Sequence, residues 1–166
     1  GTAAHQPPVQ SAQSLQAALG EAMHRTLEWH RPGQPLDTQP LRHALASQYS
    51  LTEEQVDTVL QRAQAILQGE GAWVWDAAQL DWQANEVDIA WQGRTLRIDR
   101  LVRQKMPGDA PSTWWVLDLK SALDPNAQDT LRNQLADYRE AVMRLHPQET
   151  VRAAFLTAQG KLVDLS

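Results

Sequence analysis

The sequence predicts a mixed α/β domain with a helical N-terminal region, and two observations lead to that prediction. The spacing of apolar residues changes along the chain: it is about four positions between 11 and 69 and about two positions between 86 and 103, which are the periods of helices and strands. The second half is then expected to run through three strands, a helix and two strands. That order is typical of a mixed sheet with an antiparallel hairpin and one helical crossover.

Three helices are expected in the first half of the chain. Residues 11–30 form the first, because its apolar residues fall on one helical face and Pro32 then ends it. The apolar residues of that face are Leu15, Leu19, Met23 and Leu27. A short helix over 41–49 follows a proline-bearing loop. A capping box over 52–55 begins the third helix, which continues to Gly69.

The second half supplies the sheet. The pair Gln92-Gly93 predicts a tight turn between the first two strands, so these two strands form a hairpin. A crossover helix is expected from about 124 to 145, because Asp124-Pro125-Asn126 breaks the chain and apolar residues then recur at helical spacing. The strands are expected at 86–91, 94–103, 113–120, 151–157 and 161–165.

Length and composition exclude several classes of protein. A chain of 166 residues supports one domain of ordinary size, or one domain with a helical appendage. We expect 1–10 to be a loose lead-in and 11–166 to be a single domain, mostly helical over 11–82 and built on the sheet over 83–166. The absence of cysteine excludes disulfide scaffolds, thiol catalysis and cysteine-ligated zinc. Apolar runs are too short to span a membrane, and the first residues do not form a signal peptide, so we expect a cytoplasmic domain with no membrane partner.

The charge of the chain is unevenly distributed. The formal net charge is −5, yet residues 91–166 hold eleven basic and nine acidic residues. Strand alternation places Arg97 and Arg103 on the same face as Asp99. A local basic stripe on an acidic protein can contact phosphates, and the alternative is an ordinary solvated strand face.

The strongest local signal is the triplet Asp118-Leu119-Lys120 at the end of an apolar strand. Alternation directs Asp118 and Lys120 to one face and Leu119, with Leu117, into a core. The hairpin can bring Asp99 opposite Asp118, and two carboxylates on neighbouring strands suit Mg²⁺ or Mn²⁺. Lys120 would then stabilise transition-state charge or orient an attacking water. The alternative is a surface ion pair between Asp118 and Lys120.

Three other features have simple structural interpretations when taken alone. His24 follows the apolar Met23 on the first helix, where a histidine is most often structural. Gln134 and Tyr138 share a helical face and indicate little by themselves. The seven tryptophans either belong to the core or face missing parent domains, and stacking on unpaired bases is the alternative.

Four sequence blocks together resemble the RecB-type nucleases of the PD-(D/E)XK superfamily. They are GEAMHRTLE (20–28), LRIDRLV (96–102), WWVLDLKS (114–121) and QLADYREAV (134–142). These blocks follow the family's order, and the tail over 153–165 resembles the family's closing strands. Leu119 stands where the family usually has tyrosine, and Leu96 stands where glycine is common. Neither departure removes a predicted ligand.

The resemblance implies a fold and a set of site residues. It implies a restriction-endonuclease-like core in which His24, Asp99 and Asp118 ligate Mg²⁺, with Mn²⁺ tolerated. The backbone carbonyl of Leu119 would add a ligand, and Lys120 would be the catalytic lysine. The resemblance further implies that two residues of the last long helix support the site or contact DNA. These two residues are Gln134 and Tyr138.

The expected activity is that of a metal-dependent deoxyribonuclease with little sequence specificity. Such domains usually belong to a helicase–nuclease of DNA repair and recombination. No phosphate-binding loop motif occurs here, so we expect a nuclease domain cut from, or separate from, its motor. The alternative is a catalytically silent nuclease-like domain that binds DNA or a helicase partner.

Overall fold

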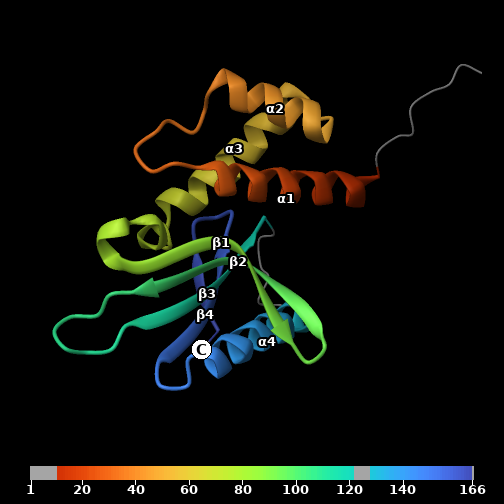
Figure 1. Ribbon diagram of the computed structural model, residues 1–166. Coiled ribbons are helices and arrows are strands. Elements are labelled where there is room, and N and C mark those ends of the chain that lie inside the picture. Colours follow the sequence, from red (N-terminus) through yellow and green to blue (C-terminus); the bar gives the residue numbers. More distant parts are fainter. Residues whose placement is uncertain (1–10, 122–127, 166) are drawn as a thin grey trace, which may run out of the picture.

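The computed structural model describes residues 11–121 and 128–165. Its helices are α1 (Ala12–Trp29), α2 (Gln39–Tyr49), α3 (Glu53–Gln68) and α4 (Asp129–Leu145). Its strands are β1 (Leu80–Trp91), β2 (Arg94–Gln104), β3 (Thr113–Lys120), β4 (Thr150–Thr157) and β5 (Leu162–Asp164). The sheet forms a middle layer, with α1, α2 and α3 on one side and α4 on the other (Figure 1). No helix in the described part of the chain is long and apolar enough to cross a membrane.

The sheet is mixed, as the sequence predicted. Its strand order is β1-β2-β3-β4-β5. Neighbouring strands are antiparallel except for β3 and β4, which are parallel. Parallel neighbours need a crossover connection, and the segment between β3 and β4 contains α4. The α/β class, the antiparallel hairpin and the crossover helix are therefore confirmed.

Side-chain caps fix where the N-terminal helices begin. The hydroxyl of Ser11 caps α1, and that of Thr38 caps α2. Thr52 and Gln55 form the reciprocal capping box that the sequence predicted for α3. Each cap satisfies a backbone amide that has no partner inside its own helix.

Strand β3 is buried on both faces and joins two hydrophobic cores. Trp115, Leu117 and Leu119 pack with residues of α1, α2 and α3. Trp114 and Val116 pack on the other side, against α4. The prediction that Leu117 and Leu119 point into a core is confirmed, and it leaves Asp118 and Lys120 on the opposite face.

Strand β1 is longer than the sequence predicted. It begins at Leu80 rather than 86 and pairs with β2 from there to the Gln92-Gly93 turn. Its first residues are mostly polar and exposed, so hydrophobic alternation does not reveal them. The mostly helical region accordingly ends at 79 instead of 82.

Two further helix boundaries bear on the sequence prediction. Helix α2 begins at Gln39 instead of 41, because Pro40 lies in its first turn, where the missing N–H is not needed. The helix start predicted near 124 lies outside the described residues.

Most of the tryptophans belong to the hydrophobic cores. Trp29 and Trp82 are the exceptions, with 43% of each residue exposed. The other five are buried or packed against a core: Trp73, Trp75, Trp91, Trp114 and Trp115. The core interpretation is confirmed for these five.

Candidate metal and catalytic centre

The candidate site forms where β2 separates from β3. The two strands pair in register up to Arg100 and Leu117. At the next position, Asp99 Oδ2 accepts a hydrogen bond from the Leu119 backbone amide at 2.9 Å. The Asp99 carboxylate thus bonds to the β3 backbone at the point where backbone pairing between β2 and β3 stops. The same register brings Asp99 opposite Asp118.

Helix α1 brings an imidazole to the same point. Leu19, Met23 and Leu27 bury the helix against the core, and His24 lies beside the end of β3. His24 Nε2 donates a hydrogen bond to the Leu119 carbonyl oxygen and lies 3.5 Å from Asp99 Oδ2. The structure therefore brings together residues that are 75 or more positions apart in the sequence.

Asp118 and Lys120 are neighbours on one face of β3. The Lys120 Nζ atom lies 3.3 Å from Asp118 Oδ1. The Asp118 side chain is only 6% exposed, and that of Lys120 is 23% exposed. The interpretation as a surface ion pair is therefore wrong for Asp118, which is a buried carboxylate.

Burial and mutual repulsion govern the protonation of the carboxylate pair. Burial, followed by the negative charge of Asp99, raises the pKa of Asp118 to about 7. Burial also raises the pKa of Asp99, although its contacts with Asp118, the Leu119 amide and Lys120 act in the opposite direction. A buried and a partly buried carboxylate beside one lysine carry unbalanced negative charge, which a bound cation would relieve.

The donor atoms of the site suit a divalent cation. Carboxylate and carbonyl oxygens are the ligands of Mg²⁺, and an imidazole nitrogen suits Mn²⁺ as well. No group of three histidine or acidic side chains stands at metal-binding spacing within residues 11–121 and 128–165. The proposed donor groups instead contact one another and their backbone neighbours: His24 donates to the Leu119 carbonyl, and the Leu119 amide donates to Asp99.

Helix α4 contributes a tyrosine near the carboxylate pair. Burial raises the pKa of Tyr138, and the charges of Asp118 and Asp99 raise it further. Gln134 Nε2 donates a hydrogen bond to the Tyr138 hydroxyl at 2.8 Å. The structure thus brings Tyr138 within electrostatic reach of the site, with Gln134 holding its hydroxyl.

The two arginines predicted to contact substrate have separate locations. Arg97 forms ion pairs with Glu86 at 3.1 Å and with Asp88 at 3.3 Å, and its side chain is 65% exposed. Arg103 lies four residues beyond Asp99 on β2, about 13 Å away along the strand. Arg97 therefore remains beside the site, whereas Arg103 does not.

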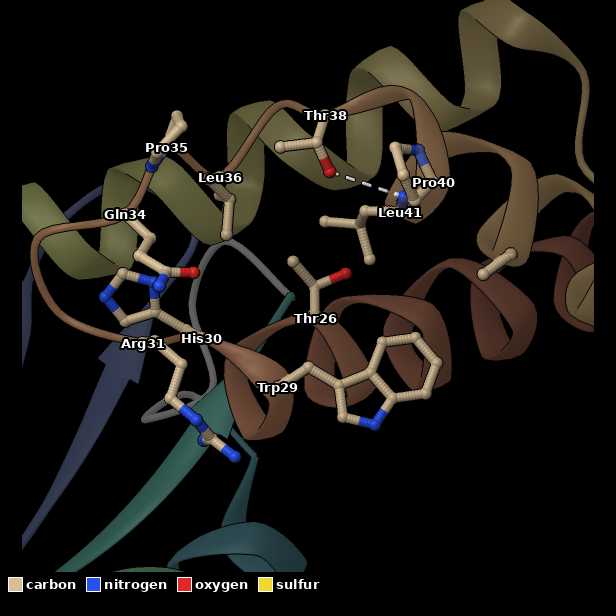
Figure 2. A pocket seen from close by; sticks show the side chains of 11 residues that line it. Thr26, Trp29, His30, Arg31, Gln34, Pro35, Leu36, Thr38, Pro40 and Leu41 are labelled. Atoms are coloured by element: carbon tan, nitrogen blue, oxygen red, sulfur yellow. Dashed lines mark hydrogen bonds between the residues drawn. The ribbon is translucent and has the colours of Figure 1, made fainter.

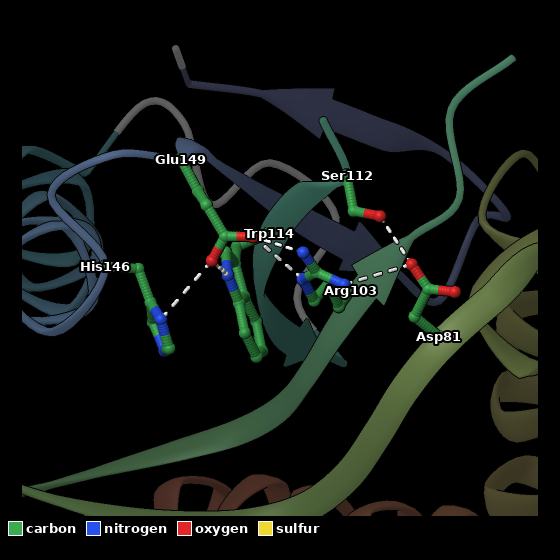
Figure 3. Close-up of polar contacts among 6 residues, drawn as sticks. All are labelled: Asp81, Arg103, Ser112, Trp114, His146 and Glu149. Atoms are coloured by element: carbon green, nitrogen blue, oxygen red, sulfur yellow. Dashed lines mark hydrogen bonds and ion pairs between the residues drawn. The ribbon is translucent and has the colours of Figure 1, made fainter. Parts of the chain in front are cut away.

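Arg103 belongs to a network at the opposite end of the sheet (Figure 3). It donates to Glu149 and to Asp81, and its guanidinium lies 5.9 Å from the Trp114 ring centroid. Trp114 in turn donates to Glu149 at 2.7 Å and stacks on His146. These contacts join β1, β2, β3 and the loop before β4, which gives Arg103 a structural role.

Replacing Arg103 by glutamine is expected to lower the free energy of unfolding by about 1–3 kcal/mol, because partly buried charged acceptors lose their donors. The matched variant Arg97→Gln removes an exposed arginine from the same strand, and its effect should stay below about 0.5 kcal/mol. Urea denaturation of both variants measures the difference. Equal losses in the two variants would contradict a structural role for Arg103.

A hollow of about 390 Å³ opens beside His24. Its lining residues are Glu21, His24, Arg25, Glu28, Tyr49, Glu86 and Arg97. Glu86 was not predicted from the sequence, and it takes a left-handed backbone conformation with φ of 54°, uncommon for a residue with a side chain. The predicted turn at 92–93 could have identified Glu86 as a residue near the site, because the register of this hairpin places Glu86 across from Asp99.

Without a divalent cation, Asp118 is expected to make the fold less stable as pH rises from about 4 to about 7. Its raised pKa means that the folded state binds the proton more tightly than the unfolded state. Stability therefore falls with pH across that window. Urea unfolding in chelator measures this effect as the difference in the free energy of unfolding between wild type and Asp118→Asn at each pH. A difference that does not change between these pH values would contradict the raised pKa.

Comparison with models of known protein families gives no match, and comparison with curated proteins gives no significant match.

Proposed function

We propose that the chain is a metal-dependent deoxyribonuclease that hydrolyses phosphodiester bonds with little sequence preference. The observation that supports this most is the convergence of two carboxylates, one of them buried, with an imidazole and a lysine where β2 leaves β3. This arrangement combines hard oxygen donors for a cation with a separate positive group, a combination that suits phosphodiester hydrolysis.

The proposed roles follow from the chemistry of each group. His24, Asp99, Asp118 and the Leu119 carbonyl would hold Mg²⁺ or Mn²⁺. When bound, the ion supplies positive charge that polarises a phosphodiester and eases the ionisation of water. Lys120 cannot ligate a cation while it is charged. Its ammonium group, held beside Asp118, instead stabilises the negative charge that develops on the reacting phosphate.

Two groups at the edge of the site would receive the DNA strand. Arg97 is exposed and lines the hollow beside His24, so it is free to exchange a surface ion pair for a phosphate. The Tyr138 hydroxyl, fixed by Gln134, is a donor that can contact a sugar or phosphate oxygen. Arg103 has no part in this proposal, because it lies at the far end of β2.

The same proposal covers the wider protein. The mixed sheet with its crossover helix is compatible with a restriction-endonuclease-like core, and the four sequence blocks resemble RecB-type nucleases. We therefore propose that the domain works with helicase domains or a helicase subunit in DNA repair and recombination. A helicase that delivers DNA would make tight binding by this domain unnecessary, because tethering raises the local concentration of substrate.

The decisive experiment incubates the whole chain with single-stranded and double-stranded DNA in Mg²⁺, in Mn²⁺ or in chelator. Cleavage is expected with either ion and is expected to stop in chelator. Mn²⁺ should be at least as effective as Mg²⁺, because the imidazole makes the ligand set slightly softer. Absence of cleavage under every condition, with DNA or helicase binding retained, would instead favour a catalytically silent nuclease-like domain.

A further inference from the structure

A buried arginine that has no acidic partner among the described residues lies on the other face of β2. Arg100 is 2% exposed. Its guanidinium donates to the Val74 carbonyl at 2.6 and 3.1 Å, to Asn85 Oδ1 at 2.7 Å and to Gln83 Oε1 at 2.6 Å. All of these acceptors are neutral, and no carboxylate forms an ion pair with Arg100 within the described ranges. A buried charge usually has a partner of opposite sign, because leaving it unpaired costs free energy.

The charge of Arg100 acts on an open pocket of about 490 Å³. Its lining residues include Arg100, Arg31, His30, Trp75 and Asn85. Arg31 extends from the end of α1, and Figure 2 shows its side chain pointing away from Leu36 and Leu41. This pocket shares no lining residue with the hollow beside His24, so it is separate from the candidate centre.

The polar groups around this pocket are mainly hydrogen-bond donors. The amide oxygens of Asn85 and Gln83 are used by Arg100, which leaves their NH₂ groups as donors. The buried Trp75 Nε1 finds no acceptor among the described residues, and the Trp75 ring lies 4.9 Å from the Arg100 guanidinium. An indole N–H can only donate, so this group also lacks an anionic or neutral acceptor.

Negative charge in the pocket is limited and already engaged. Among the described residues that line the pocket, Asp76 is the single carboxylate. Its two oxygens accept from the Ala78 amide and from Gln79 Nε2. The positive character of the pocket also affects His30, whose pKa is lowered by burial and then by the charges of Arg100 and Arg31.

We propose that this pocket binds a phosphate group, with Arg31 in direct contact and the buried charge of Arg100 attracting it. The ligand is either free inorganic phosphate or a phosphate group of a nucleic-acid backbone. The Arg31 guanidinium can bind two phosphate oxygens at once. The Arg100 charge acts through an interior of low dielectric constant, so it contributes without leaving its own partners. This proposal does not depend on the nuclease proposal.

The test is a titration of the isotope-labelled whole chain with inorganic phosphate, exchanged against chloride at constant ionic strength. The indole N–H resonance of Trp75, assigned with Trp75→Phe, is expected to shift and to saturate. Arg31→Gln is expected to weaken phosphate binding at least about tenfold, because a charge-assisted contact is lost. Arg31 is exposed, so this variant is expected to fold. A substitution of the buried Arg100 is instead expected to destabilise the fold, so it is not used as the test.

Arg132→Gln is the matched control, since it removes an exposed arginine from α4, and its phosphate affinity should equal that of wild type. The proposal is overturned if the wild-type resonance does not shift saturably, or if the Arg31 and Arg132 variants bind equally. A single-stranded oligonucleotide in chelator identifies the source of the phosphate. If it shifts the same resonance and phosphate displaces it, the ligand is a nucleic-acid backbone. If only inorganic phosphate causes the shift, the ligand is free phosphate. Either result supports the proposal that this pocket binds a phosphate group.

Discussion

Replacing Asp118 by asparagine is expected to reduce metal-dependent cleavage by about 1000-fold or more, which corresponds to about 4 kcal/mol of transition-state stabilisation. The substitution keeps the shape of the side chain and removes one of two negative charges that face the proposed cation. Rates on single-stranded DNA at saturating Mn²⁺ measure the loss. A folded variant that cleaves at the wild-type rate would exclude this site.

The same variant separates catalysis from folding. In chelator near pH 8, Asp118→Asn should be at least as stable as wild type, because it removes a buried negative charge that lies beside the carboxylate of Asp99. Mn²⁺ should raise the melting temperature of wild type and have little effect on the variant, since ligand binding stabilises only a fold that binds the ion. Asp109→Asn, in an exposed loop, is the control and should respond to Mn²⁺ as wild type does.

The order and type of the main elements could be predicted from the sequence because their signals are local. Apolar spacing identified α1, and the Thr52 capping box identified the start of α3. The Gln92-Gly93 turn identified the hairpin between β1 and β2. The first part of β1 was missed, because its residues are mostly polar and face solvent. Its strand conformation depends on pairing with β2, which the local sequence does not show.

The candidate site was predictable only in part, and the difference depends on register. Alternation gives the faces of Asp99 and Asp118, and the antiparallel register of β2 with β3, in which Arg100 pairs with Leu117, places the two carboxylates opposite one another. The approach of His24 depends on how α1 crosses the sheet, which no spacing within α1 determines. Its assignment to the site came from the resemblance to a nuclease family, and the structure independently brings it to Asp99.

The ionic and hydrogen-bond partners of the arginines on β2 were the least predictable. Alternation placed Arg103 on the face of Asp99, yet distance along β2 removes it from the site and its contacts hold Glu149 and Trp114. Alternation also placed Arg100 on the opposite face, but gave no indication that its partners would all be neutral. Local alternation along a strand determines the face on which a side chain lies, whereas its ionic partners depend on the packing of the whole chain.

Replacing Lys120 by methionine is expected to reduce cleavage by about 100-fold to 1000-fold, because a preorganised positive group no longer faces the reacting phosphate. Methionine keeps an unbranched, apolar side chain of similar length, so packing against β3 is largely retained. Lys161→Met is the matched control. Lys161 carries the same charge on an exposed turn, and its loss should leave the cleavage rate unchanged.

Metal affinity distinguishes a catalytic lysine from a merely structural one. The Lys120 ammonium lies 3.3 Å from Asp118 Oδ1 and cannot itself ligate a cation. Removing its positive charge makes the carboxylate pair more attractive to Mn²⁺, so Lys120→Met should bind the ion as tightly as wild type or more tightly. Calorimetry with Mn²⁺ measures this directly. If affinity and cleavage were lost together, Lys120 would be holding the ligands in place, and the proposed division between binding and reaction would be wrong.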